Sequence, residues 1–161
     1  MKKLNIARFS LVFASLIALT VASGQEPRPV GTVGGRLQGT WEMQITLTDC
    51  AGHVIRSLPS LIEFAAGGTV VESNGGTPPA LKTPGEGVWG HTTDSKYAFR
   101  FKFFTFNAQN VFTGWTIIAG ETAVDSSGDA NTGTATVEIY DPNGNLVASL
   151  CAETVGTRFE L

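Results

Sequence analysis

The sequence predicts an all-β protein: an eight-stranded antiparallel barrel with up-and-down strand order, preceded by an export signal. Three observations lead to this prediction. Residues 40–48 alternate strictly between apolar and polar side chains, as a strand with one buried face requires. Short runs rich in β-branched and aromatic residues follow between turn residues, with no sustained helical period after Gly39. The segment before these strands differs, with a basic start and one apolar run.

The first 24 residues have the pattern of a secretory signal peptide. Basic residues precede an apolar run over residues 9–21, and small residues follow up to Gly24. The apolar run is short for a membrane span, so we expect cleavage close to Gly24 and release into the periplasm or the extracellular space. The first cysteine is Cys50, far from the expected cleavage site, so no lipid membrane anchor is indicated.

The remaining chain is predicted to form one domain. Residues 25–38 are rich in proline and glycine without a period, which is typical of a flexible leader. Residues 39–161 suffice for a single core. Removal of Lys2, Lys3 and Arg8 leaves 8 of the 11 basic residues against 14 acidic ones, a formal charge of −6. No phosphate-binding footprint is present, so we expect no nucleic-acid partner.

Seven further strands are expected after the first. Turn residues separate them, because Gly and Asn adopt the positive φ that tight turns need. Two connections exceed a hairpin, residues 74–86 and 121–132. Long loops are often functional or disordered, and the first is a candidate for bordering a ligand entrance. The predicted strands cover residues 40–49, 60–66 with 54–58 pairing before Pro59, 69–73, 87–92, 96–106, 111–119, 133–140 and 146–159.

In a closed barrel the first and last strands lie side by side, and this pairing brings the two cysteines together. Two cysteines in an exported chain are typical of a disulfide rather than a metal site or a catalytic thiol. Pairing Cys50 with Cys151 sets Trp41 near Glu160 and one diagonal step from Arg158, with both cysteines facing outward. The bridge would close a loop of about 100 residues and contribute about 2 to 4 kcal/mol.

The residues Gly39-Thr40-Trp41 at the start of the first strand, with Arg158 near the end of the last, resemble the calycin barrels, which include lipocalins and avidins. The resemblance implies that Trp41 plugs one end of a lipocalin-like barrel. It also implies that the Arg158 guanidinium lies over the indole as a cation–π contact, and that Gly39 lets the chain pass beneath it. The resemblance carries over no ligand and no cofactor.

The predicted strand over residues 96–106 supplies an aromatic wall on one face and places Arg100 and Lys102 on the other. The aromatic residues of the wall are Tyr97, Phe99, Phe101 and Phe103. The aromatic rings either line a cavity for a flat or apolar ligand or fill the barrel. The adjacent Phe104 suggests a bulge after Phe103 that would turn Phe104 and Phe106 inward. The residues predicted to bind a ligand are Trp89, Tyr97, Phe99, Phe101, Phe103 and Trp115.

The sequence offers little for catalysis or metal binding. His53 and His91 are the only histidines and no Gly-x-Ser-x-Gly motif occurs, so neither a catalytic triad nor a zinc motif is predicted. Residues 125–131 form an oxygen-rich loop, but the glutamate that closes a calcium loop is missing. We therefore predict no catalytic residue, no metal and no cofactor.

These features predict an exported barrel that binds or carries a small, mostly apolar ligand. A first alternative is a filled barrel that acts through its surface as an envelope structural or inhibitor protein, with Val147, Val155 and Phe159 forming a patch. A second is a cyclase- or isomerase-type enzyme that uses Tyr97 or an inward glutamate for proton transfer. Candidates for such a glutamate in the predicted strands are Glu63, Glu72, Glu138 and Glu153.

Overall fold

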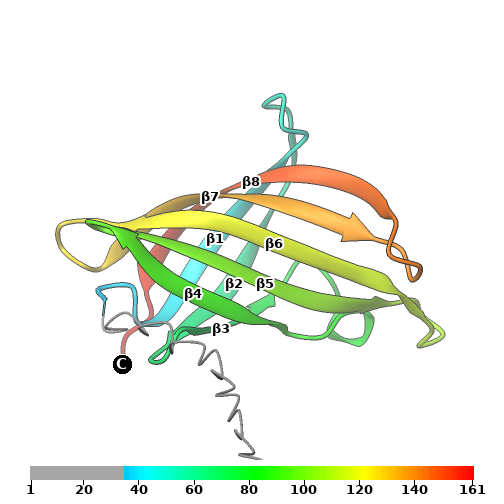
Figure 1. Ribbon diagram of the computed structural model, residues 1–161, viewed down its shortest axis with the longest axis horizontal. Coiled ribbons are helices and arrows are strands. Elements are labelled where there is room, and N and C mark those ends of the chain that lie inside the picture. Colours follow the sequence, from blue (N-terminus) through cyan, green and yellow to red (C-terminus); the bar gives the residue numbers. More distant parts are fainter. Residues whose placement is uncertain (1–34) are drawn as a thin grey trace, which may run out of the picture.

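The structure, a computed structural model, describes residues 35–161, which form a closed antiparallel barrel (Figure 1). The predicted signal peptide and most of the predicted leader lie outside the described residues. Neighbouring strands pair in sequence order, and β1 pairs with β8 to close the ring. The predicted up-and-down eight-stranded barrel is confirmed. The elements are β1 Gly39–Thr48, β2 Val54–Ala65, β3 Thr69–Asn74, the 3-10 helix η1 Pro79–Leu81, β4 Gly85–Thr93, β5 Lys96–Phe106, β6 Phe112–Val124, β7 Ala130–Tyr140 and β8 Leu146–Arg158.

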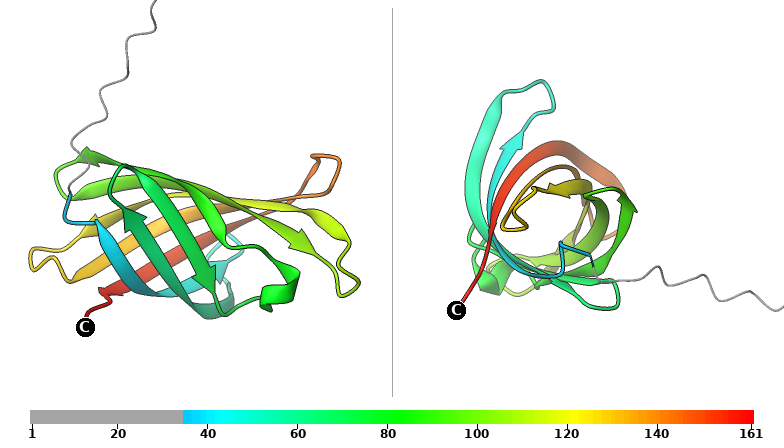
Figure 2. Two further views of the ribbon diagram at one scale, coloured as in Figure 1. Left: turned by 90° about the horizontal axis from the view of Figure 1, so that it is seen from below. Right: turned by 90° about the vertical axis from the view of Figure 1, so that its left-hand side faces the viewer.

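The barrel has two different ends (Figure 2). The closed end carries the start of β1, the end of β8 and the hairpins β2–β3, β4–β5 and β6–β7. The open end carries the other connections, and Figure 1 shows the β1–β2 hairpin rising there from the body of the barrel. Among residues 35–161, no helix is long and apolar enough to span a membrane.

β2 runs through Pro59 without a break, so the predicted segments 54–58 and 60–66 form one strand that ends at Ala65. The Pro59 carbonyl accepts a hydrogen bond from the Gly75 amide at 2.9 Å, which shows that the backbone groups of Pro59 point toward β3. The last β2–β3 pair is Ser60 with Asn74. The missing N–H of Pro59 therefore costs no hydrogen bond to β1.

β6 and β7 are longer than predicted, and residues 125–129 form a short turn between them. The predicted long connection over residues 121–132 is wrong. Thr122 and Val124 are buried at the end of β6, and a Cβ on Gly133 of β7 would come within 2.5 Å of the Glu121 carbonyl oxygen. Small and polar residues here serve close strand packing rather than a loop.

The β1–β8 register differs by two residues from the predicted one. Trp41 pairs directly with Arg158, and Thr48 rather than Cys50 pairs with Cys151. Cys50 lies in the turn after β1 with a φ of 64° and reaches Cys151 from there, with a Cα–Cα distance of 4.9 Å. The predicted disulfide is confirmed, and a two-residue shift leaves the inward and outward faces unchanged.

The predicted bulge after Phe103 is wrong. β5 stays in register with β6 through the pair Phe104–Trp115, and the irregularity falls later, between Thr105 and Phe106. Gly114 absorbs it with a φ of 128°, where an added Cβ would lie 2.0 Å from the Tyr140 carbonyl oxygen. Phe104 therefore faces outward and is 44% exposed.

Candidate functional site

Large apolar side chains seal the closed end of the barrel. Trp41 and Leu37 are completely buried, and the Trp41 indole N–H donates to the Leu37 carbonyl at 2.8 Å. The rings of Phe64, Trp89 and Tyr97 pack in edge-on and tilted pairs beside them, which is a favourable aromatic geometry. Leu37 belongs to the segment predicted as a leader, so its last residues form part of this plug.

Arg158 covers the plug. Its guanidinium lies 4.3 Å from the centre of the Trp41 ring. It also donates hydrogen bonds to the carbonyls of Gln38 at 2.9 Å and Gly128 at 2.8 and 3.0 Å. Gly39 has a φ of 127°, and a Cβ there would lie 2.8 Å from the Arg158 guanidinium. The glycine thus provides room for the arginine.

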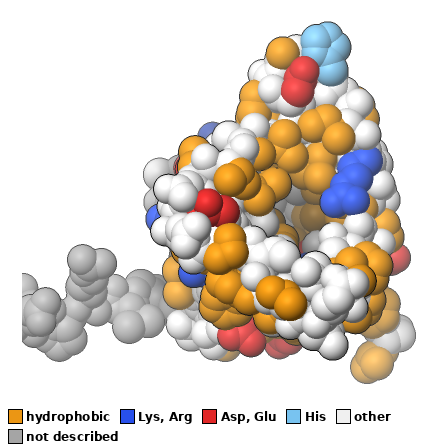
Figure 3. Space-filling view, turned by 90° about the vertical axis from the view of Figure 1, so that its right-hand side faces the viewer, with side chains coloured by type: hydrophobic (Ala, Val, Ile, Leu, Met, Phe, Trp, Pro, Cys, Tyr) orange, Lys and Arg blue, Asp and Glu red, His pale blue; other side chains and the backbone are white. Residues whose placement is uncertain are grey.

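Above the plug lies a cavity of about 260 Å³. Figure 3 shows the hollow at the open end, bordered by hydrophobic side chains and a basic one. Eight-stranded barrels are wide enough to hold one small ligand when side chains do not fill them. The cavity is lined mainly by apolar residues of β1, β2, β5, β6, β7 and β8: Ile45, Leu47, Leu58, Ile62, Phe99, Phe101, Phe103, Ile118, Ala135, Val137, Ile139, Leu150 and Ala152.

A buried ion pair lies in one wall of this cavity. Glu72 of β3 is 1% exposed, and its Oε2 accepts a hydrogen bond from the Lys82 ammonium at 2.8 Å. Its Oε1 accepts hydrogen bonds from Ser60 at 3.2 Å and from the Asn74 amide at 2.6 Å. Lys82 also lies 4.4 Å from the centre of the Phe103 ring. Glu72 and Lys82 therefore neutralise each other's charge within the wall of the cavity.

The ion pair holds the β3–β4 connection against the barrel. β3 and β4 pair only from Thr69–Val88 to Glu72–Gly85, so residues 75–84 continue the wall above them. Lys82 forms an isolated bridge to Thr105 of β5. This predicted long loop thus borders the cavity, and Thr77 from it is a lining residue.

One arginine lies at the cavity mouth. Arg56 of β2 pairs with Leu47 of β1 and lines the cavity. Its Nη1 donates to the Gly76 carbonyl at 2.8 Å. Arg56 and Glu72 are the only ionisable residues of the described chain that line this cavity.

The six residues predicted to bind a ligand separate into three places. Phe99, Phe101 and Phe103 line the cavity. Trp89 and Tyr97 belong to the plug beneath it. Trp115 lies on the outer face and does not line the cavity. Its orientation follows from its pairing with the outward-facing Phe104.

The outer face carries its own aromatic row around Trp115. The indole stacks on Tyr140 at a centroid distance of 5.6 Å and on Phe112 at 6.4 Å. The Lys102 ammonium lies 4.2 Å from the Trp115 ring centre. The Tyr140 hydroxyl donates to Glu138 at 2.9 Å, and this hydrogen bond raises the pKa of Tyr140. The row covers the outside of β6 and β7 near the open end.

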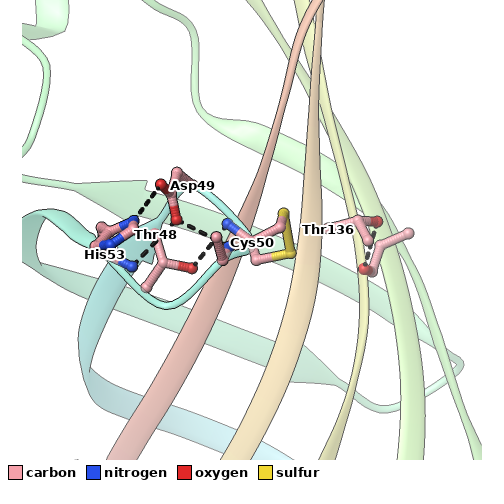
Figure 4. Close-up of a disulfide and its surroundings, with 8 residues drawn as sticks. Thr48, Asp49, Cys50, His53 and Thr136 are labelled. Carbon is pink, nitrogen blue, oxygen red and sulfur yellow. Dashed lines mark hydrogen bonds and ion pairs between the residues drawn. A yellow bond between two sulfur atoms is a disulfide. The ribbon is translucent and has the colours of Figure 1, made fainter.

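The disulfide and the first histidine lie together on the outside (Figure 4). The His53 ring contacts the Asp49 carboxylate at 2.8 Å. This hydrogen bond, followed by that from the Ala51 amide, lowers the pKa of Asp49. His91 contacts the Asp94 carbonyl at 2.7 Å at the closed end. Neither histidine lines the cavity.

The oxygen-rich turn after β6 binds its own backbone. Asp125 accepts hydrogen bonds from the Ser127 hydroxyl and the Gly128 amide, and these lower its pKa. Asp129 lies 3.8 Å from Arg158 Nε. Across residues 35–161, no group of three or more His, Cys, Asp or Glu side chains is placed to hold a metal ion.

No family model matches this chain, and no curated protein matches its sequence. The geometry of the cavity is therefore the main indication of function.

Two cavity residues, Arg56 and Glu72, were not among the predicted binding residues. Glu72 follows two consecutive valines, Val70 and Val71, so alternation could not decide which face of that strand is buried. Arg56 lies in the segment 54–58, which is separated by Pro59 from the strand predicted over residues 60–66. The other strand glutamates differ from Glu72 in exposure: Glu63 and Glu153 are exposed and Glu138 is half-buried.

Proposed function

We propose that this protein is an exported barrel that binds or carries a small, mostly apolar molecule in its interior. The observation that carries the proposal is the cavity of about 260 Å³, walled by aliphatic residues and three phenylalanines above a sealed floor. Apolar, concave sites with few polar groups are the usual form of small-molecule sites. A sealed floor with one mouth suits uptake and release from one end.

The disulfide supports the exported location. Cys50 and Cys151 are bridged, and disulfides of this structural kind persist in oxidising compartments outside the cytoplasm. The bridge joins the β1–β2 hairpin to β8 on the outer face (Figure 4). It therefore stabilises the seam of the barrel without entering the cavity.

The two alternatives have less support. A barrel acting only through its surface has no need of an interior cavity, although the half-buried aromatic row around Trp115, with the exposed Phe112, offers a contact surface. An enzyme would use Glu72 as the inward carboxylate, but three donors already occupy its oxygens. Tyr97 is 2% exposed in the plug. Ligand binding is the function that the geometry supports best.

The test is a titration with N-phenyl-1-naphthylamine, an uncharged apolar fluorophore whose emission rises in apolar sites. The wild-type protein is expected to bind it with a stoichiometry of one. Ala135→Phe, which adds a ring inside the cavity, should reduce the affinity at least about tenfold. Thr134→Phe, on the outer face of the same strand, is the matched control. Equal binding by both variants would place the fluorophore outside the barrel and contradict the proposal.

A further inference from the structure

Arg56 breaks the inward pattern of β2. The residues that share its face along the strand are Leu58, Ser60, Ile62 and Phe64, all of them buried. Arg56 continues this inward-facing register but is itself exposed, and a charged residue that interrupts an inward apolar pattern is typical of functional positions. Arg56 lies where this face reaches the cavity mouth.

Most of the Arg56 guanidinium has no partner. Its single hydrogen bond to a described residue joins Nη1 to the Gly76 carbonyl at 2.8 Å. No carboxylate within residues 35–161 forms an ion pair with it, whereas the other charges at the cavity, Glu72 and Lys82, neutralise each other at 2.8 Å. The Nε and Nη2 donors of Arg56 form the planar pair that matches the two oxygens of a carboxylate.

We propose that the ligand is an apolar molecule with a single carboxylate, bound with its chain in the cavity and its carboxylate on Arg56. The proposal depends on the proposed ligand-binding function and specifies its ligand. A monoanion balances the one uncompensated positive charge at the site. The apolar wall formed by Leu47, Leu58 and Phe103 then receives the hydrocarbon part.

The remaining polar groups favour a carboxylate over a phosphate. The other polar side chains near the mouth are Asn74, Thr77 and Thr105, which carry no charge. A phosphate dianion would leave one negative charge unbalanced, because Lys82 is already paired with Glu72. A lone arginine therefore fits a monoanion best.

The cavity volume limits the length of the ligand. About 260 Å³ corresponds to roughly nine water volumes of about 30 Å³ each, a volume similar to that of a methylene group. A straight chain of roughly eight carbons therefore fills the cavity when its carboxylate lies at the mouth. Octanoate is the appropriate probe.

The experiment compares octanoate, octan-1-ol and octylamine by isothermal titration calorimetry at pH 8, with N-phenyl-1-naphthylamine as a charge-independent reference. The wild-type protein is expected to bind octanoate at least about tenfold more tightly than octan-1-ol, and octylamine most weakly. Arg56→Gln should remove the preference for octanoate while octan-1-ol and the fluorophore bind as before. Arg56→Lys, which keeps the charge without the planar donor pair, should give an intermediate preference.

Arg100→Gln is the matched control, because Arg100 is exposed on the outer face of β5; it should keep the full preference. Equal binding of octanoate and octan-1-ol by the wild-type protein overturns the carboxylate assignment and leaves the proposed function intact. An octanoate preference that survives in Arg56→Gln overturns the role of Arg56. If neither the fluorophore nor any eight-carbon probe binds, the proposed function itself fails, and this inference fails with it.

Discussion

The two ends of the barrel each hold an arginine on the inward-facing register, and the two side chains have different surroundings. Arg158 at the closed end stacks 4.3 Å from the centre of the Trp41 ring and donates to the carbonyls of Gln38 and Gly128. Arg56 at the open end donates only to Gly76 among the described residues. Arg158 thus covers the closed end with its donors occupied, whereas Arg56 at the open end keeps donors free.

The comparison separates what stabilises the fold from what serves binding. At the closed end, an aromatic plug fills the barrel and the guanidinium is saturated by backbone acceptors. At the open end, the cavity is empty of side chains and its wall depends on the buried Glu72–Lys82 pair. Substitutions at the closed end or in the Glu72–Lys82 pair should therefore change stability, whereas substitution of Arg56 at the mouth should change ligand affinity.

The largest expected effect is that of Trp41→Ala. Trp41 is completely buried, and truncation of a buried aromatic side chain leaves a cavity that the neighbours fill only in part, so we expect a loss of about 4 kcal/mol in the free energy of unfolding. Urea denaturation followed by circular dichroism measures it. Trp115→Ala, on the outer face, is the control and should cost less than half as much. Equal costs would show that Trp41 is not the plug of the closed end.

The second prediction concerns the wall of the open end. Lys82→Met leaves the Glu72 carboxylate buried without its cation, and we expect a loss of about 3 kcal/mol in urea denaturation. Adding Glu72→Gln should recover most of the loss, because the amide oxygen still accepts hydrogen bonds from Ser60 and Asn74. Lys102→Met on the outer face should have little effect. Failure of the double variant to recover would mean that Lys82 acts through packing rather than charge.

The third prediction tests the two arginines directly. Arg158→Gln removes charge-assisted hydrogen bonds to Gln38 and Gly128 and the contact with Trp41, so it should lower the free energy of unfolding by about 2 kcal/mol. Arg56→Gln should change it by less than about 0.5 kcal/mol, because one hydrogen bond of an exposed side chain is lost. Urea denaturation of both variants under one buffer condition gives the comparison. Similar losses would remove the distinction between a structural and a binding arginine.

The part of the fold that sequence reasoning recovered depends on strict alternation. Residues 40–48 alternate without exception, and this pattern predicted the inward face of β1. Phe99, Phe101 and Phe103 were placed on one face for the same reason, and they line the cavity. The pairing of β1 with β8 followed from closure of the barrel, and the disulfide between Cys50 and Cys151 followed from the presence of two cysteines in an exported chain. Alternation defines faces reliably, but it left the register uncertain by two residues because Cys50 reaches its partner from a turn.

Arg56, which sequence reasoning missed, and Trp115, which it placed on the wrong face, lie where alternation is interrupted. Pro59 suggested a break in β2, so the inward direction of Arg56 was not considered. Trp115 follows Gly114, whose φ of 128° shifts the register at the start of β6. The residues after it are apolar on both faces. Orientation at such positions follows from pairing with neighbouring strands, which one sequence does not display.

The smallest expected effect is the acid dependence of stability, and it should also differ between the ends. Asp125 lies in a turn at the closed end, and Asp49 and Asp141 lie in turns at the open end. Hydrogen bonds lower the pKa of each of these carboxyls below 3.8. The largest contribution comes from Ser127 for Asp125, from His53 for Asp49 and from Asn145 for Asp141. A carboxyl whose pKa is lowered in the folded protein stabilises the fold at pH values above its ordinary pKa. This contribution is lost as the pH falls through the lowered pKa.

The urea concentration at the midpoint of unfolding should therefore decrease when the pH is lowered below about 4. Two such carboxyls, Asp49 and Asp141, lie at the open end and one, Asp125, lies at the closed end. The double variant Asp49→Asn/Asp141→Asn should therefore reduce the acid dependence more than Asp125→Asn, and Glu42→Gln on the outside of β1 is the control. A larger effect of Asp125→Asn would assign the acid-sensitive contacts to the closed end.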